Sequence, residues 1–155
     1  MILSKKTKYK IALKKKCIDI LDERIRSIKL AMHEAQAAAN NEEKSSAGDK
    51  YETSRAMNHL EKDMQASRLS ASLRELENLM LIDCSKTYGK VQKGSLVKCG
   101  KISYFIAAGL GKLLFEDEIV FLVSPNAPIA LKLSGKAAGD RLEINNEQLI
   151  IEEVF

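Results

Sequence analysis

The chain has 155 residues, of which 45% are hydrophobic and 30% charged, and this balance predicts a folded protein of one ordinary domain or two small ones. The aromatic share is only 5%, without Trp, which favours a helix-rich protein with a modest core. The net charge of +4 is mild, but residues 5–16 carry seven Lys and no acid, which suggests a polyanionic partner near this end.

The three cysteines, Cys17, Cys84 and Cys99, are far apart and form no CxxC pair. This spacing argues for a reducing compartment and against a disulfide framework or a zinc site. Lysines interrupt the apolar residues at the N-terminus, so no signal peptide is expected, and no apolar run approaches the ~20 residues needed to span a bilayer. The expectation is a soluble cytoplasmic protein without a membrane partner.

The first predicted helix follows Ser4 or Thr7, either of which can cap it, and runs to about residue 38 or 39, a length of about 45 Å. Asn40-Asn41 weakens the helical preference beyond that point, because Asn side chains compete for backbone hydrogen bonds. Apolar side chains recur at steps of three and four, as in a coiled-coil seam, and Lys14 is the one polar residue at a seam position. They are Ile11, Ile18, Leu21, Ile25, Ile28, Met32, Ala35 and Ala39.

The second predicted helix begins near residues 46–49 and continues to about Leu81. Its outer seam is Met57, Leu60 and Met64, and a leucine-rich series that starts at Leu69 is two residues out of phase with it. Two helices of similar length predict an antiparallel coiled-coil hairpin over residues 1–83, with its tip near residues 41–52.

The helical period stops near Ile82, and residues 84–94 are expected to form a linker with turn signals. Residues 95–155 then show short strand patterns and form the expected C-terminal domain. Gly109-Leu110-Gly111-Lys112 is interpreted as a turn. The fold class is α+β, a helical hairpin followed by a small α+β domain. The expected strands are 95–99, 102–107, 118–123, 141–144 and 148–154, with a short helix at 127–133 and a two-residue turn at Asn145-Asn146.

Asp49 and Glu52 place two carboxylates one helical turn apart at the expected tip. One interpretation is structural, because Ser46 and Asp49 have the spacing of a capping box and Glu52 would favour the helix dipole. The other is functional, because one or two carboxylates commonly hold Mg²⁺ together with water and substrate phosphate oxygens. Such a pair would complete a metal site on another macromolecule without forming a full site itself.

Two motifs resemble one known family. Residues 48–53, Gly-Asp-Lys-Tyr-Glu-Thr, are similar to the tip of the Gre family of bacterial transcript-cleavage factors, with its Gly-Asp-x-x-Glu-Asn pattern. Residues 128–140, with Pro-Ile-Ala first and Gly-Lys-x-x-Gly-Asp last, resemble the signature of that family's C-terminal domain. Gly94-Ser95-x-Val97 fits the opening of the same domain, and the order of hairpin, linker and β domain also matches.

The resemblance implies an FKBP-like C-terminal domain that docks on RNA polymerase, with Pro128 and Ile129 in the docking loop. It implies that the coiled coil enters the secondary channel of the polymerase. There Asp49 and Glu52 would help hold the second Mg²⁺ of the polymerase active site while a backtracked transcript is cleaved. The chain would then be a monomer that binds no cofactor alone and is no enzyme by itself, with nascent RNA or DNA as a further partner.

Other functions stay open. Thr-Ser-Arg-Ala follows Glu52 where the family usually has Asn-Ala-Glu-Tyr, and aligning Tyr51 with that Tyr instead puts Lys44 and Ala47 at the acidic positions. The alternative is a Gre-like regulator that occupies the same channel and inhibits or modulates the polymerase without stimulating cleavage. Peptidyl-prolyl isomerase activity follows only from the FKBP-like comparison, and few aromatics exist to line a proline pocket.

The lysine run is either a solvated helix face or a contact for nucleic-acid phosphates, for which Lys14, Lys15 and Lys16 are the candidates. Tyr9 is the only aromatic among these lysines, so a platform for base stacking is not expected.

Overall fold

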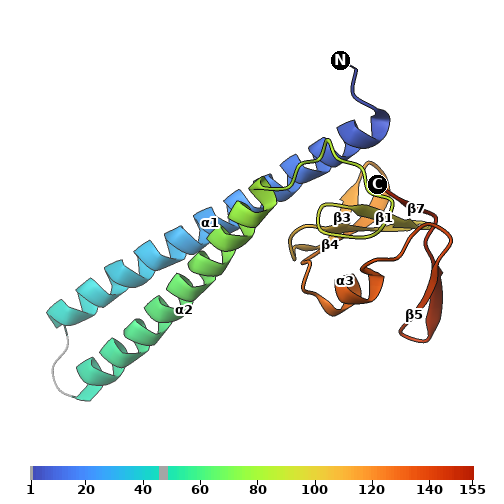
Figure 1. The fold of residues 1–155 in the computed structure, drawn as a ribbon. Coiled ribbons are helices and arrows are strands. Elements are labelled where there is room, and N and C mark those ends of the chain that lie inside the picture. The colour runs from blue at the N-terminus through green and yellow to red at the C-terminus, as the bar shows by residue number, and fades with distance from the viewer. Residues whose placement is uncertain (1, 46–48) are drawn as a thin grey trace. The chain divides into compact units, whose positions relative to one another are not determined.

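The computed structural model describes residues 2–45 and 49–155, with side chains at all of these positions except 42–45 and 49–51. Two long helices, α1 (Lys5–Ser45) and α2 (Asp49–Met80), pack together, and a small mixed sheet follows them (Figure 1). The expected class, a helical hairpin followed by an α+β domain, is confirmed. The chain divides into two compact units, one formed by residues 20–75 and the other by residues 1–19 together with 76–155.

In the unit of residues 20–75, α1 turns an apolar stripe toward α2. Leu21, Ile25 and Ile28 are buried, and Met32 is half-buried one turn further on. The stripe then narrows to alanines, because Ala35 and Ala39 occupy the next seam positions. This part of the predicted seam is confirmed.

Helix α1 continues to Ser45, so the prediction that it ends at residue 38 or 39 is wrong. An Asn in a helix costs only about 0.7 kcal/mol or less relative to Ala, and the Glu-Glu-Lys that follows Asn40-Asn41 favours helix. Asn40 also finds a partner within the helix, because its Oδ1 accepts a hydrogen bond from Gln36 Nε2 at 3.1 Å. The only residues between the two helices, 46–48, lie outside the described part of the chain.

Helix α2 faces α1 with polar side chains, so the predicted outer seam is wrong. Met57, Leu60 and Met64 are 66%, 61% and 44% exposed. The burial instead follows a seven-residue step through Asn58, Gln65, Ser72 and Leu79. The leucine-rich series that starts at Leu69 is only partly buried, since Leu73 and Met80 are 45% and 59% exposed.

The first turns of α1 belong to the other unit and follow a different pattern. Ile11, a predicted seam residue, is 43% exposed, whereas Leu13 and Cys17 are fully buried. The stripe rotates because this part of α1 packs within the sheet-containing unit. Ser4 caps the helix, as one of the two predicted caps, by accepting the Thr7 N–H on its Oγ at 3.1 Å.

The main sheet has the strand order β3-β4-β2-β1-β7, and a separate hairpin pairs β5 with β6 (Figure 1). Only β2 and β4 run parallel to each other. The elements are β1 (Leu96–Cys99), β2 (Ile102–Ile106), β3 (Gly111–Phe115), β4 (Glu118–Val123), α3 (Pro128–Leu133), β5 (Arg141–Ile144), β6 (Glu147–Ile150) and β7 (Glu153–Val154). The core of this unit lies where α3 packs on the sheet, with Val97, Tyr104, Ile106, Ala130, Leu133 and Ile151 buried together.

Two predictions in this domain are wrong. Gly111 and Lys112 do not form a turn but begin strand β3 at the edge of the sheet. The β3–β4 turn was missed because its central residues, Glu116 and Asp117, are not the Gly or Asn that usually marks positive φ, although their φ angles are 49° and 64°. The last predicted strand is two strands, since β6 pairs with β5 whereas β7 pairs with β1.

Candidate functional site

The two acidic residues singled out in the sequence lie in the first turn of α2. Asp49 is the first residue of the helix, and Glu52 is an exposed residue one turn further. The side chain of Asp49 and the whole of Ser46 lie outside the described residues, so the capping box is untested. Glu52 is exposed, and the partial positive charge of the helix N-terminus favours its negative charge.

Polar contacts in the described part of the hairpin join α1 to α2 and span single turns of α2. Arg24 on α1 and Glu75 on α2 form an ion pair at 4.0 Å, and Gln65 Nε2 donates to Glu61 Oε1 at 2.8 Å. Toward the turn the seam consists of alanines facing Ser54 and Asn58. Burial of small or polar side chains contributes little free energy, so the packing weakens from Ile25 toward the turn.

Lys14 has a structural partner. Its Nζ donates to the carbonyl oxygens of Met80 at 3.2 Å and Ile82 at 2.7 Å. These carbonyls lie at and just beyond the C-terminus of α2, whose last turn contains no basic residue of its own. Lys14 therefore caps α2 from α1, satisfying helix-end carbonyls with a charged donor. Lys15 and Lys16, the other two candidate phosphate contacts, are exposed.

Pro128 and Ile129, the candidate docking residues, begin α3. Pro128 is exposed at the first helical position, where its missing N–H costs nothing. Ile129 is half-buried and packs against the core cluster of the sheet-containing unit. Leu131, two residues later, is 63% exposed and adds an apolar side chain to the surface of the same short helix.

The remaining residues of the C-terminal motif shape the chain after α3. Gly135 and Gly139 have φ angles of 78° and 93°. Residues with a Cβ atom rarely adopt this left-handed conformation, which explains glycine at both positions. Asp140 closes the turn between them, since its Oδ2 accepts the Ala137 N–H at 2.8 Å. These motif residues therefore have structural roles, whereas Pro128 and Leu131 are exposed apolar side chains on α3.

Sequence reasoning missed Lys10, whose side chain is fully buried. Its Nζ donates to the Lys86 carbonyl oxygen at 3.0 Å and lies 4.9 Å from the ring centroid of Tyr88. Burial lowers the pKa of Lys10, and the nearby Cys84 and Asp83 offset part of this shift. The helical spacing could have indicated this burial, because Lys10 lies three residues before Leu13 and seven before Cys17, and both are buried on the same helix face.

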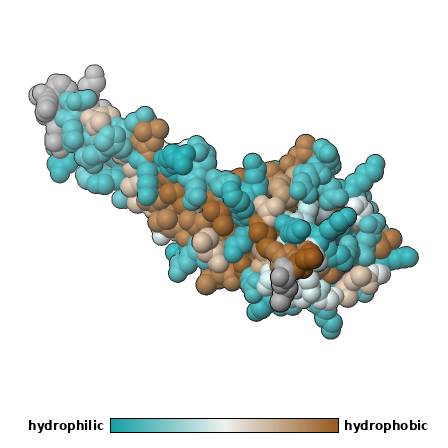
Figure 2. Space-filling model, turned by 90° about the horizontal axis from the view of Figure 1, so that it is seen from above, coloured by the Kyte–Doolittle hydropathy of each residue, from teal (hydrophilic) through white to brown (hydrophobic). Residues whose placement is uncertain are grey.

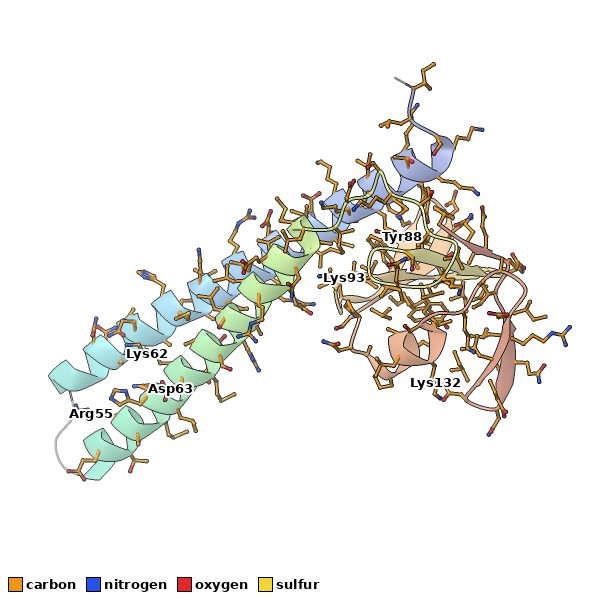
Figure 3. All side chains as sticks on the ribbon, in the orientation of Figure 1. Arg55, Lys62, Asp63, Tyr88, Lys93 and Lys132 are labelled. Carbon is orange, nitrogen blue, oxygen red and sulfur yellow. The ribbon has the colours of Figure 1, made fainter. Side chains whose placement is uncertain are left out.

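A cavity of about 180 Å³ lies beside this buried lysine. It is lined by Leu81, Ile82, Asp83, Lys86, Tyr88 and Lys93. Tyr88 and Lys93 both come from the segment that follows α2, as Figure 3 shows. Asp83 is engaged locally, because its carboxylate accepts hydrogen bonds from Ser85 N and Oγ, which lowers its pKa.

Neither a metal cluster nor a membrane span is found in the part of the chain that the structure describes. No three His, Cys, Asp or Glu side chains there are grouped to hold a metal ion. No helix there is both long enough and apolar enough to cross a bilayer. Comparisons with protein-family models, with curated proteins and with solved structures found no match.

Proposed function

We propose that the chain is a transcript-cleavage factor that binds RNA polymerase and presents the carboxylates of Asp49 and Glu52 to the active-site Mg²⁺. The observation that carries the proposal is the position of both residues in the first turn of α2, at the turn end of a long helical hairpin. The two-motif resemblance to the Gre family supplies the partner and the reaction class.

The chemistry divides between the two molecules. The polymerase supplies the catalytic centre, and Mg²⁺ there supplies Lewis acidity and activates water for attack on the RNA phosphodiester. The chain contributes carboxylate oxygens, which suit Mg²⁺ because this ion prefers oxygen ligands and keeps several waters. A hairpin arm of about 26 residues, 20–45, extends about 39 Å at 1.5 Å per residue, which is long enough to carry the carboxylates into a narrow channel.

The C-terminal unit supplies the docking surface in this proposal. Its α+β class is compatible with the FKBP-like domain that the resemblance implies. Pro128 and Leu131 lie exposed on α3, where they offer apolar contacts to the polymerase. Ala130 and Leu133 of α3 are buried in the core of this unit, so the proposed docking residues are presented on a helix that is packed against the sheet.

The second candidate is a regulator that occupies the polymerase channel without stimulating cleavage. It is favoured by Arg55, an exposed cation one helical turn after Glu52, which would oppose a divalent cation at the tip. Figure 3 shows Arg55 on the same end of α2.

Stalled, backtracked polymerase complexes separate these candidates. Wild-type protein should raise the yield of cleaved RNA, and the D49N/E52Q variant should lose this stimulation while it still competes with the wild type for polymerase. The matched control is E34Q/D63N, which removes the same charge from two exposed residues further along the hairpin. Full stimulation by D49N/E52Q would exclude the tip assignment, and inhibition by the wild type would favour the regulator.

A further inference from the structure

The lysine run at the start of α1 divides into an inward and an outward set. Lys10 and Lys14 donate to backbone carbonyl oxygens, and Lys6 pairs with Glu153. The outward set is Lys5, Lys8, Lys15 and Lys16, all exposed. At 100° per residue these four fall within one arc of about 100° on the helix, so they share a single face of α1.

The outward lysines form no ion pair in the structure. None of the four lies within 4.0 Å of a carboxylate among the described residues. Residues 2–18 contain no acid, and Asp19, which is exposed on the same face one turn after Lys15, leaves the face with a net positive charge. Four like charges on one face repel one another, so the surface gains free energy from a polyanion that brings them together.

The spacing of the set fits a phosphate backbone. Lys5 and Lys16 are separated by about 16 Å along the helix axis at 1.5 Å per residue. A stacked strand with about 3.4 Å per phosphate presents about five phosphates over that length. Ala12, which lies between the lysines on this face, offers no hydrogen-bonding side chain to a base edge.

Base stacking is excluded on this face by the position of Tyr9. Its ring packs edge-to-face on Phe115, with 5.3 Å between centroids, and its hydroxyl is buried. The apolar side of the same helix segment is also occupied, since Leu13 and Cys17 are fully buried. Of the large apolar side chains exposed in residues 2–19, which are Ile2, Leu3 and Ile11, only Ile11 lies in α1. This segment therefore lacks the broad apolar face with which an amphipathic helix inserts into lipid, and a membrane is a poorer partner than a nucleic acid.

We infer that Lys5, Lys8, Lys15 and Lys16 form a surface that binds the phosphate backbone of single-stranded nucleic acid without regard to sequence. The inference goes beyond the tip chemistry and does not depend on it, because the binding involves only this face of α1. Lys14, one of the three lysines predicted from the sequence to contact nucleic acid, is not part of this surface, because its ammonium caps α2.

The test is fluorescence anisotropy of a short labelled oligo(dT), titrated with the full-length protein in the absence of polymerase at several salt concentrations. The test variant K5Q/K8Q/K15Q/K16Q should bind roughly tenfold or more weakly at low salt. Its plot of log affinity against log salt should flatten by about 0.7 for each phosphate contact that is lost. Oligo(dA) should bind the wild type as tightly as oligo(dT) does.

The matched control is K90Q/K101Q/K112Q/K132Q, which removes the same charge from four exposed lysines elsewhere. It should retain wild-type affinity, and circular dichroism should show that both variants keep their helix content. Equal weakening in both variants would overturn the inference, because net charge alone would then explain binding. Absence of oligonucleotide binding by the wild type would also overturn it, as would binding to anionic vesicles in place of the oligonucleotide.

Discussion

A fully buried ammonium lies in the first turns of α1. Lys10 is held by the Lys86 carbonyl oxygen and the face of the Tyr88 ring, which compensate only part of the cost of removing a charge from water. Its neighbours along the chain, Lys8 and Ile11, are both exposed. Lys8 is therefore a solvated charge, whereas Lys10, two residues later, links α1 to the segment that follows α2.

The stability of the protein should depend on pH through Lys10. Burial lowers its pKa below the ordinary value of 10.5. Between these two pKa values the unfolded chain binds more protons than the folded one, so the contribution of Lys10 to the free energy of unfolding rises with pH. The free energy of unfolding of the wild type minus that of K10M should therefore increase as the pH rises from about 7 to about 10.

Urea unfolding of the two proteins across this pH range provides the measurement. Both proteins carry C84A, because Lys10 lowers the pKa of Cys84 and the titration of that thiol would otherwise differ between them. Titrations of the other cysteines and of the tyrosines are common to both proteins and cancel in the difference. K16M, at an exposed lysine on the same helix, is the control and should show a pH-independent difference. A flat difference for K10M would mean that the ammonium is solvated in the folded protein.

The three thiols should be unreactive in the folded protein. Cys17, Cys84 and Cys99 are all buried, and burial raises the pKa of Cys17 to about 12 and that of Cys99 to about 11. Burial raises the pKa of Cys84 as well. Because the thiolate is the reactive form, Ellman's reagent at about pH 8 should label the native protein at least about a hundredfold more slowly than the denatured chain. Rapid labelling of any one thiol under native conditions would contradict this burial.

At the scale of the elements, α2 carries an apolar stripe that does not face α1. Hydrophobic side chains reach the surface among hydrophilic ones in the view of Figure 2, and Met57, Leu60 and Met64 are the exposed apolar residues on this part of α2. Three apolar residues within about two turns are a short stripe, and Ser67 and Ala71 continue it weakly. Side chains of α1 therefore supply most of the apolar contact in the hairpin.

Truncations to alanine should distinguish the two sides of the hairpin. Ile25 is 8% exposed and Leu60 is 61% exposed. I25A should reduce the free energy of unfolding by about 2–5 kcal/mol, whereas L60A should change it by about 0.5 kcal/mol or less. Urea unfolding followed by circular dichroism measures both variants. A loss for L60A as large as that for I25A would put Leu60 in the seam between the helices.

These elements also show how far the sequence predicts the fold. The turn at Asn145-Asn146 was predicted from two residues that tolerate left-handed backbone, and their φ angles are 51° and 65°. The α1 stripe was predicted from Leu21 onward because a single partner helix covers it there. The failed parts of the two predicted seams have a common cause, which is that sequence periodicity does not identify the partner of a helix face. Ile11 and Met57 are apolar at seam spacing, yet both face solvent.

The candidate site was less predictable than the fold. Sequence motifs selected Asp49 and Glu52, and the structure confirms only that both lie in the first turn of α2. Composition alone did not show which lysines of residues 5–16 face outward, because that depends on the sheet packing against α1. Lys14 was grouped with Lys15 and Lys16 for this reason, although its ammonium caps α2.

At the scale of the whole molecule, the proposed roles lie on separate parts of the chain. The turn end of the hairpin carries the carboxylates, α3 offers apolar contacts for docking, and the first turns of α1 present unpaired lysines. The carboxylates and the lysines each have a variant that removes them without changing the residues of the other parts. The function is therefore testable part by part with the intact chain.

The most direct measurement is a Mg²⁺ titration of RNA cleavage in stalled polymerase complexes, with wild type and with D49N/E52Q. If the tip carboxylates help bind the catalytic metal, the wild type should move half-maximal cleavage to a lower Mg²⁺ concentration, because added ligands raise affinity for the ion. With D49N/E52Q, half-maximal cleavage should occur at the same Mg²⁺ concentration as in polymerase complexes to which no factor is added. Stimulation by the wild type at an unchanged midpoint, or the same midpoint shift with D49N/E52Q, would contradict the claim that this hairpin acts by supplying metal ligands.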